Sequence, residues 1–127
     1  MSNRVVHFEI PYDDAERASA FYAGTFGWNM MPMPDMGYVM VGTGPSGDQG
    51  PTESGFINGG MLQRQGEWTA PNIVIDVENL EESLKAVEEH GGKTVVERQP
   101  VGDMGFTAYC KDSEGNLVGL WETAQPG

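Results

Sequence analysis

The sequence has 127 residues, of which 39% are hydrophobic and 20% are charged, a composition typical of one folded domain. Nineteen acidic residues against seven lysines and arginines give a formal net charge of −12, which disfavours binding to nucleic acids and to anionic membranes. No apolar run is long enough to span a membrane, and the N-terminus lacks the apolar stretch of a secretory signal. The single cysteine, Cys110, cannot form an internal disulfide and is expected in the core, so we expect a cytoplasmic protein.

The first patterned segment, Arg4–Pro11, alternates in the manner of a β-strand. Its apolar face carries Val6, Phe8 and Ile10. His7 and Glu9 share the other face. The pair Asp13-Asp14 then predicts the start of a helix, and Gly24 and Gly27 predict its end. The apolar residues at helical spacing in this segment are Ala15, Ala18, Phe21 and Tyr22.

The same arrangement returns in the second half of the chain. Asn72–Val77 is an apolar strand, and Asn79 predicts the N-cap of a second helix. The apolar stripe of that helix is formed by Leu80, Leu84 and Val87. The two halves align without a gap at an offset of 65 residues, which places His7 on Asn72 and Gly27 on Gly92. Repetition of this kind predicts two copies of one structural unit.

Three strand-like segments follow each predicted helix. They are Trp28–Met33, Gly37–Gly42 and Gly55–Leu62 in the first half, and Lys93–Arg98, Gly105–Lys111 and Asn116–Glu122 in the second. Each half therefore reads β-α-β-β-β, and the fold class is α+β. A single domain, residues 1–127, is expected to hold module one (3–62), a connector (63–69) and module two (70–123). Residues 43–54 read either as a plain surface loop or as a lid over a site.

The opening strand Val5–Pro11, the helix end Phe21–Trp28 and the final turn and strand Asp112–Glu122 occur in the order of a known group. Over residues 3–123 the chain resembles the glyoxalase/bleomycin-resistance/extradiol-dioxygenase superfamily, whose members are also called vicinal oxygen chelate proteins. The resemblance implies two modules, related by a pseudo-twofold axis, whose curved mixed sheets enclose a cavity. It also implies a homodimer.

Enzymes of this superfamily hold a divalent metal with a His on the first strand of one module, a counterpart on the first strand of the other, and Glu on the last strands. Carried over, this set places His7 at the first position and Asn72 at the second. The last-strand positions fall on Gly119 and within 58–60, where no carboxylate stands. His7 is therefore the only match to the set, and one imidazole does not hold a metal. Glu122 is expected to point away from Gly119, and His90 is expected to complement the end of its helix.

The eight methionines and the aromatic residues favour a pocket that binds an apolar or aromatic molecule. His7 has two readings, a polar wall residue or a group that orients a ligand or acts as an acid or base. Glu9 either raises the pKa of His7 or is a plain wall charge. The predicted ligand-binding residues are His7, Glu9, Trp28, Tyr38, Asn72 and Trp121.

Two functions remain open at this point. The first is a cofactor-free, glyoxalase-like binding protein that holds its ligand in the cavity between the modules. The alternative is a divalent-metal-dependent lyase, isomerase or dioxygenase with an unorthodox site, which rests on His7 and on fold resemblance. A module that mainly dimerises is a third reading. The expected partners are a small-molecule ligand and a second copy of the chain, with no nucleic acid and no membrane.

Overall fold

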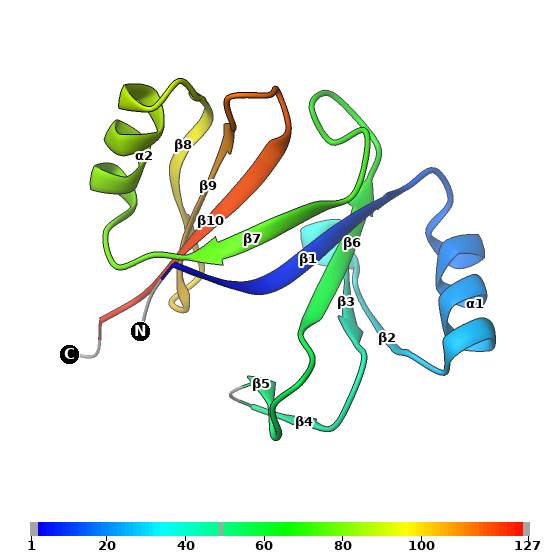
Figure 1. Ribbon diagram of the computed structural model, residues 1–127. Helices are drawn as coiled ribbons and strands as arrows, with labels where there is room; N and C mark the ends of the chain where they lie inside the picture. The colour runs from blue at the N-terminus through cyan, green and yellow to red at the C-terminus, as the bar shows by residue number, and fades with distance from the viewer. Residues whose placement is uncertain (1–2, 49, 126–127) are drawn as a thin grey trace. The chain divides into compact units, whose positions relative to one another are not determined.

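The computed structural model describes residues 3–48 and 50–125. The chain forms two compact units: a first unit, His7–Pro71, and a second unit formed by the described residues up to Val6 together with those from Asn72 onward. In the sequence, the first unit begins at His7, within the opening strand, and ends at Pro71, just after the predicted connector. Residues 3–6 belong to the second unit, where the Asn3 N–H donates to the Asp76 carbonyl. Each unit carries one α-helix beside a mixed sheet, which confirms the α+β class (Figure 1).

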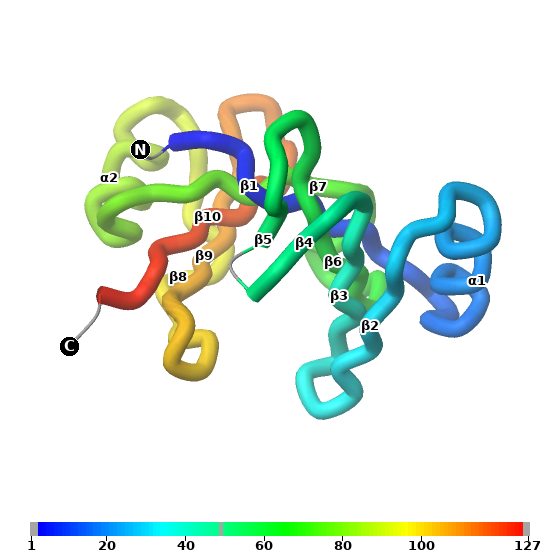
Figure 2. Tube along the Cα trace, turned by 90° about the horizontal axis from the view of Figure 1, so that it is seen from below, coloured from blue at the N-terminus to red at the C-terminus, as the bar shows by residue number. Residues whose placement is uncertain are grey.

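The first unit has a main sheet of four strands with one α-helix beside it. In chain order the elements are β1 (Arg4–Tyr12), α1 (Ala15–Phe26), β2 (Asn29–Met33), the 3₁₀ turn η1 (Pro34–Met36), β3 (Tyr38–Gly42) and β6 (Asn58–Gln63). The strand order is β2-β3-β6-β1, with β1 parallel to β6 and the other pairs antiparallel. In Figure 2 the β2–β3 hairpin ends in the cyan turn η1. The β-α-β-β-β order predicted for module one is therefore confirmed.

The segment 43–54 holds a short ladder between β4 (Ser46–Gly47) and β5 (Gly50–Pro51) that the sequence did not indicate. Asn58 ties this segment to β6, since its Oδ1 accepts from the Thr43 N–H at 2.9 Å and its Nδ2 donates to Ser46 Oγ at 2.8 Å. Two-residue strands show no alternation, so periodicity could not reveal them.

Helix α1 begins as predicted and ends at Gly27, with Gly24 inside it, but it buries less than expected. Asp14 caps its start by accepting from the Arg17 N–H, and Gly27 ends it with a positive φ of 73°. No residue of α1 is buried, and Phe21 is 55% exposed. Its ring packs edge-on against Tyr22 at 5.0 Å between centroids, so the aromatic residues of this helix contact one another as well as the sheet. The core of the unit is formed by Val39, Val41 and Met61.

The second unit repeats the plan with a larger core. Its elements are β7 (Asn72–Asp76), α2 (Leu80–Glu89), β8 (Lys93–Val101), β9 (Gly105–Lys111) and β10 (Leu117–Thr123), in the strand order β7-β10-β9-β8. Leu80 and Leu84 of α2 pack with Cys110, which is buried as predicted. Asn79 caps the helix by accepting from the Glu82 N–H, also as predicted.

Glu122 lies on the helix side of its sheet, as the strand spacing predicted. Its Oε1 accepts from the Leu80 N–H at 2.9 Å, and its Oε2 lies 3.3 Å from Arg98 Nη2. The Arg98 guanidinium also lies over the Phe106 ring, 3.6 Å from its centroid. His90, at the end of α2, lies with Nδ1 2.9 Å from the Ala86 carbonyl, so its role there is structural.

Leu80 is fully buried, so its truncation tests the α2 core. Leu80→Ala is expected to lower the free energy of unfolding by about 2–5 kcal/mol, measured by urea titration, because it removes buried methyl groups and leaves a cavity. Lys85→Ala, on the exposed side of the same helix, is the matched control and is expected to change it by less than about 0.5 kcal/mol. Equal effects of the two substitutions would contradict this assignment of the core.

Candidate functional site

The sheet face of the first unit that lies opposite α1 brings together three of the predicted site residues, His7, Glu9 and Tyr38. Strand register explains why. His7 pairs with Asn58 and Glu9 with Gly60 across the parallel β1–β6 ladder, so these side chains share a face. Tyr38 begins β3, which neighbours β6, and its ring crosses Gly60 to reach β1. Residues far apart in the sequence are thereby joined through adjacent strands.

A chain of hydrogen bonds connects these three side chains. His7 Nε2 lies 2.8 Å from the Tyr38 hydroxyl oxygen, and that hydroxyl donates to Glu9 Oε2 at 3.1 Å. Glu9 is buried, with 5% of its surface exposed, and His7 is half-buried. The His7 and Tyr38 ring planes are inclined by only 14°. A buried carboxylate requires such a donor, because leaving it without hydrogen bonds costs far more than one bond contributes.

Gly60 makes room for this chain. A Cβ atom at this position would overlap the hydroxyl and ring of Tyr38. Its neighbour Gly59 makes the same allowance on the other face, where a Cβ would overlap the Phe8 ring and carbonyl. The paired glycines therefore let an aromatic ring lie against each face of β6. The sequence pointed to this stretch only as lacking a carboxylate, although glycine inside a strand is itself a signal of close approach.

Burial lowers the pKa of the His7 imidazole below its ordinary value of 6.5, while the nearby Glu9 carboxylate acts to raise it. Of the two readings of Glu9, the structure supports a raising effect on the His7 pKa, but desolvation is the larger effect and the net direction is downward. His7 is accordingly favoured in its neutral form.

Methionine side chains flank the polar chain on the same face. Met33 pairs with Tyr38 across the β2–β3 ladder, and Met31 pairs with Met40. Met31 is 43% exposed and Met33 is 39% exposed. The face thus joins a flexible apolar surface to a small number of fixed polar groups, the composition found in small-molecule sites.

Trp28 is the predicted site residue of the first unit that lies away from this group. Trp28 packs on the α1 side of the sheet, with its ring parallel to Tyr22 at 5.0 Å and close to Phe8 at 5.8 Å. Asn72 and Trp121 belong to the second unit. Asn72 is buried there and its Nδ2 donates to the Ile73 carbonyl at 3.3 Å, while Trp121 Nε1 donates to Thr123 Oγ1 at 3.1 Å.

The residues present do not fit the divalent metal of the superfamily's enzymes. Within residues 3–48 and 50–125, no three His, Cys, Asp or Glu side chains gather where they could hold a metal ion. The last-strand positions are also closed by their neighbours. Tyr38 occupies the space beside Gly60, and a Cβ at Gly119 would lie 3.0 Å from Val74 Cγ2 and 3.1 Å from Tyr109 Cε1. A ligand set of imidazole and carboxylates therefore has no equivalent in either unit.

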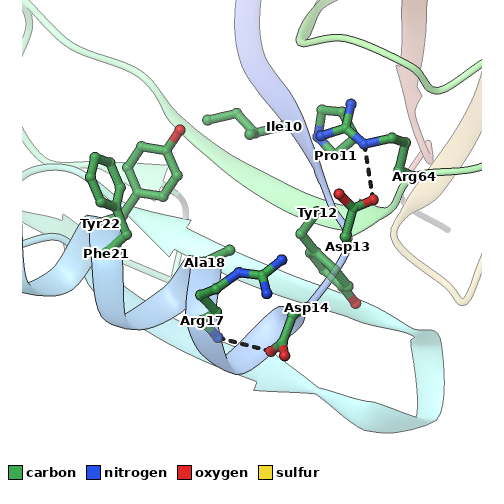
Figure 3. Close-up of a pocket in the computed structure, with 10 residues that line it drawn as sticks. All are labelled: Ile10, Pro11, Tyr12, Asp13, Asp14, Arg17, Ala18, Phe21, Tyr22 and Arg64. Atoms are coloured by element: carbon green, nitrogen blue, oxygen red, sulfur yellow. Dashed lines mark hydrogen bonds and ion pairs between the residues drawn. The ribbon is translucent and has the colours of Figure 1, made fainter.

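A separate hollow of about 370 Å³ opens between the end of β1 and the first turns of α1 (Figure 3). Both acids at its rim are engaged: Asp13 pairs with Arg64 at 3.1 Å, and Asp14 caps α1. Ile10 and Tyr22 contribute to its apolar wall. This hollow lies on the helix side of the sheet, and none of the predicted site residues lines it.

Comparison with known proteins identifies the fold. A family model described as bleomycin resistance protein-like N-terminal matches residues 4–44, which span β1 to β3 and the following residues. A glyoxylase-like domain-containing protein of Didymella fabae is 29% identical over 122 residues, covering 91% of each chain. The chain therefore has the fold of the glyoxalase/bleomycin resistance/dioxygenase superfamily. The resemblance drawn from the sequence is confirmed.

Solved structures match nearly the whole chain. A superfamily member from Vibrio splendidus is similar with a TM-score of 0.61 and 16% identity, over 95% of this chain and 98% of that one. The methylmalonyl-CoA epimerase of Mycobacterium tuberculosis gives a TM-score of 0.60 at 16% identity, over 95% of this chain and 88% of its own. At such identities the likeness concerns the fold.

Among the described residues, no helix is long and apolar enough to cross a bilayer.

The contact between Gly60 and Tyr38 gives the first test of the site. Gly60→Ala is expected to lower the free energy of unfolding by about 1–3 kcal/mol, because the new methyl group must displace the Tyr38 ring. Gly24→Ala is the matched control, since a Cβ there meets no atom within 4 Å and alanine favours the helix. It is expected to be neutral or stabilising. Urea titration of both variants measures these changes in the free energy of unfolding. A neutral Gly60→Ala would contradict the close approach of the Tyr38 ring to Gly60.

The lowered pKa of His7 predicts how stability depends on pH. The unfolded chain takes up a proton near the ordinary imidazole pKa of 6.5, whereas the folded chain does so only at lower pH. The free energy of unfolding is therefore expected to fall as the pH decreases from above 6.5 toward the lowered pKa. His7→Gln should reduce this dependence, and His90→Gln is the control that retains the His7 contribution. Identical pH dependences of His7→Gln and the parent protein would contradict the direction of the shift.

Proposed function

We propose that this protein binds a small apolar or aromatic molecule without a metal, on the first-unit face that carries His7, Glu9 and Tyr38. One observation carries the proposal. The polar groups on this face are hydrogen-bonded to one another, and the strand that pairs with the strand of Tyr38 carries two exposed methionines, Met31 and Met33. Catalysis is not assigned, since no nucleophile with an activating base is present in this group.

The energetics suit a ligand held mainly by apolar contact. Burying about 200 Å² of apolar ligand surface contributes about 5 kcal/mol before the cost of ordering the ligand and the side chains. A hydrogen bond to His7 adds about 1 kcal/mol net. The methionine side chains adapt to the shape of the ligand, which suits a broad range of molecules.

The metal-dependent alternative is supported by the shared fold alone. Methylmalonyl-CoA epimerases are among the solved structures with this fold, but their identity to this chain is low. The residues at the four expected ligand positions do not form a donor set here. The homodimer and the cytoplasmic location remain predictions. Light scattering that returns a monomer of about 14 kDa at micromolar concentrations would contradict the homodimer.

Binding of 2-naphthol, an apolar aromatic probe, tests the proposal. In a chelating buffer, the parent protein is expected to bind it by isothermal titration with an affinity unchanged from buffer without chelator. His7→Ala is expected to weaken binding by about tenfold, because it removes one orienting hydrogen bond and its packing. His90→Ala, at the end of α2, is the control and should bind as the parent does. Loss of binding in chelator alone would overturn the metal-free proposal.

A further inference from the structure

The hydrogen bonds that join His7, Tyr38 and Glu9 have a donor-to-acceptor direction, and this direction determines which ligand atoms His7 can recognise. A tyrosine hydroxyl carries one proton. The Tyr38 hydroxyl donates this proton to Glu9 Oε2, so its oxygen can only accept from His7. Nε2 of His7, at 2.8 Å, must then carry a hydrogen.

The same proton count determines whether the other ring nitrogen of His7 carries a hydrogen. In a neutral imidazole one nitrogen is a donor and the other is an acceptor. With the proton on Nε2, Nδ1 of His7 presents a lone pair. Among the residues that the structure describes, none hydrogen-bonds to this atom. Burial, which disfavours the charged imidazolium, supports the neutral form.

We infer that the Tyr38–Glu9 pair locks His7 into the Nε2–H tautomer, so that the site selects apolar molecules that carry a hydrogen-bond donor, such as a phenol or an N–H heterocycle. The inference rests on the proposed function and adds the class of ligand. A phenol can donate its O–H to Nδ1, and its ring supplies the apolar surface that the proposed function requires. The corresponding methyl ether has the same apolar body but leaves the lone pair of a half-buried nitrogen without a partner, which is costly.

Tyr38 and Glu9 are positioning residues in this scheme, because they act on the ligand only through His7. Their effect is therefore visible in the imidazole itself. The chain contains two histidines, and His90 supplies an internal reference. Its Nδ1 lies 2.9 Å from the Ala86 carbonyl oxygen, an acceptor, so Nδ1 carries the proton there. The two histidines are expected to show opposite tautomers.

Nitrogen NMR reports directly which nitrogen of each imidazole carries the proton. The full chain is labelled with ¹⁵N-histidine, and spectra are recorded at about pH 8, where an unperturbed imidazole is neutral. His7 is expected to show a protonated Nε2 and an unprotonated Nδ1, with the assignment made by His90→Gln. Tyr38→Phe should remove the bias and give a mixture of tautomers. Tyr12→Phe, on the same strand as His7 but on its helix side, should leave the spectrum of His7 unchanged. A protonated Nδ1 in the parent protein would overturn the inference.

Isothermal titration with a matched pair of probes tests the ligand class. The parent protein is expected to bind 2-naphthol about tenfold more tightly than 2-methoxynaphthalene, and Tyr38→Phe is expected to reduce that ratio. Equal affinity for the two probes would overturn the inference while leaving small-molecule binding intact. Binding of neither probe, with His7 still in the Nε2–H form, would overturn the proposed function together with the ligand class.

Discussion

The absence of a side chain at Gly60 is the constraint on which the candidate site depends. Any Cβ atom there would occupy the position of the Tyr38 hydroxyl, and without that hydroxyl neither His7 nor Glu9 keeps the partner seen here. The two hydrogen bonds of this hydroxyl offset part of the cost of burying a carboxylate and half-burying an imidazole on one strand. The glycine therefore makes room for the hydroxyl that joins these two side chains in one chain of hydrogen bonds.

The second unit also has a glycine whose surroundings leave no room for a side chain. Gly119 stands on the last strand of its sheet, and Val74 and the Tyr109 ring close around it. By resemblance, both glycine regions correspond to positions where enzymes of the superfamily carry metal-binding carboxylates. In this chain, aromatic rings take up that space. The shared fold and the altered chemistry are compatible, because a fold positions residues without specifying which residues they are.

The fold was predictable from the sequence because the repeated strand and helix patterns are long and begin with clear caps. Asp14, Asn79 and Gly27 mark helix boundaries that local chemistry determines. The two-residue strands in 43–54 were not predictable, because they contain too few residues to show a period. The exposure of Phe21 was also missed, since helical spacing identifies an apolar stripe but not whether a partner covers it.

The candidate site was predicted in part. Alternation placed His7 and Glu9 on one face, and Tyr38 was named among the ligand-binding residues. Their connection required the register of β1, β3 and β6, which a single sequence does not specify. Trp28 was grouped with them because aromatic residues suit both a pocket and a core. The structure places it on the helix side, where Tyr22 and Phe8 contact it.

The central claim is that Tyr38 and Glu9 act as a coupled pair, and a double-mutant cycle on the free energy of unfolding tests it most directly. Tyr38→Phe, Glu9→Leu and the double variant would be compared with the parent protein by urea titration at neutral pH. We predict a coupling free energy of about 1–3 kcal/mol, the range for residues that share one hydrogen-bond network. Effects that add to within about 0.5 kcal/mol would show that the two side chains are independent, and would contradict this account of the site.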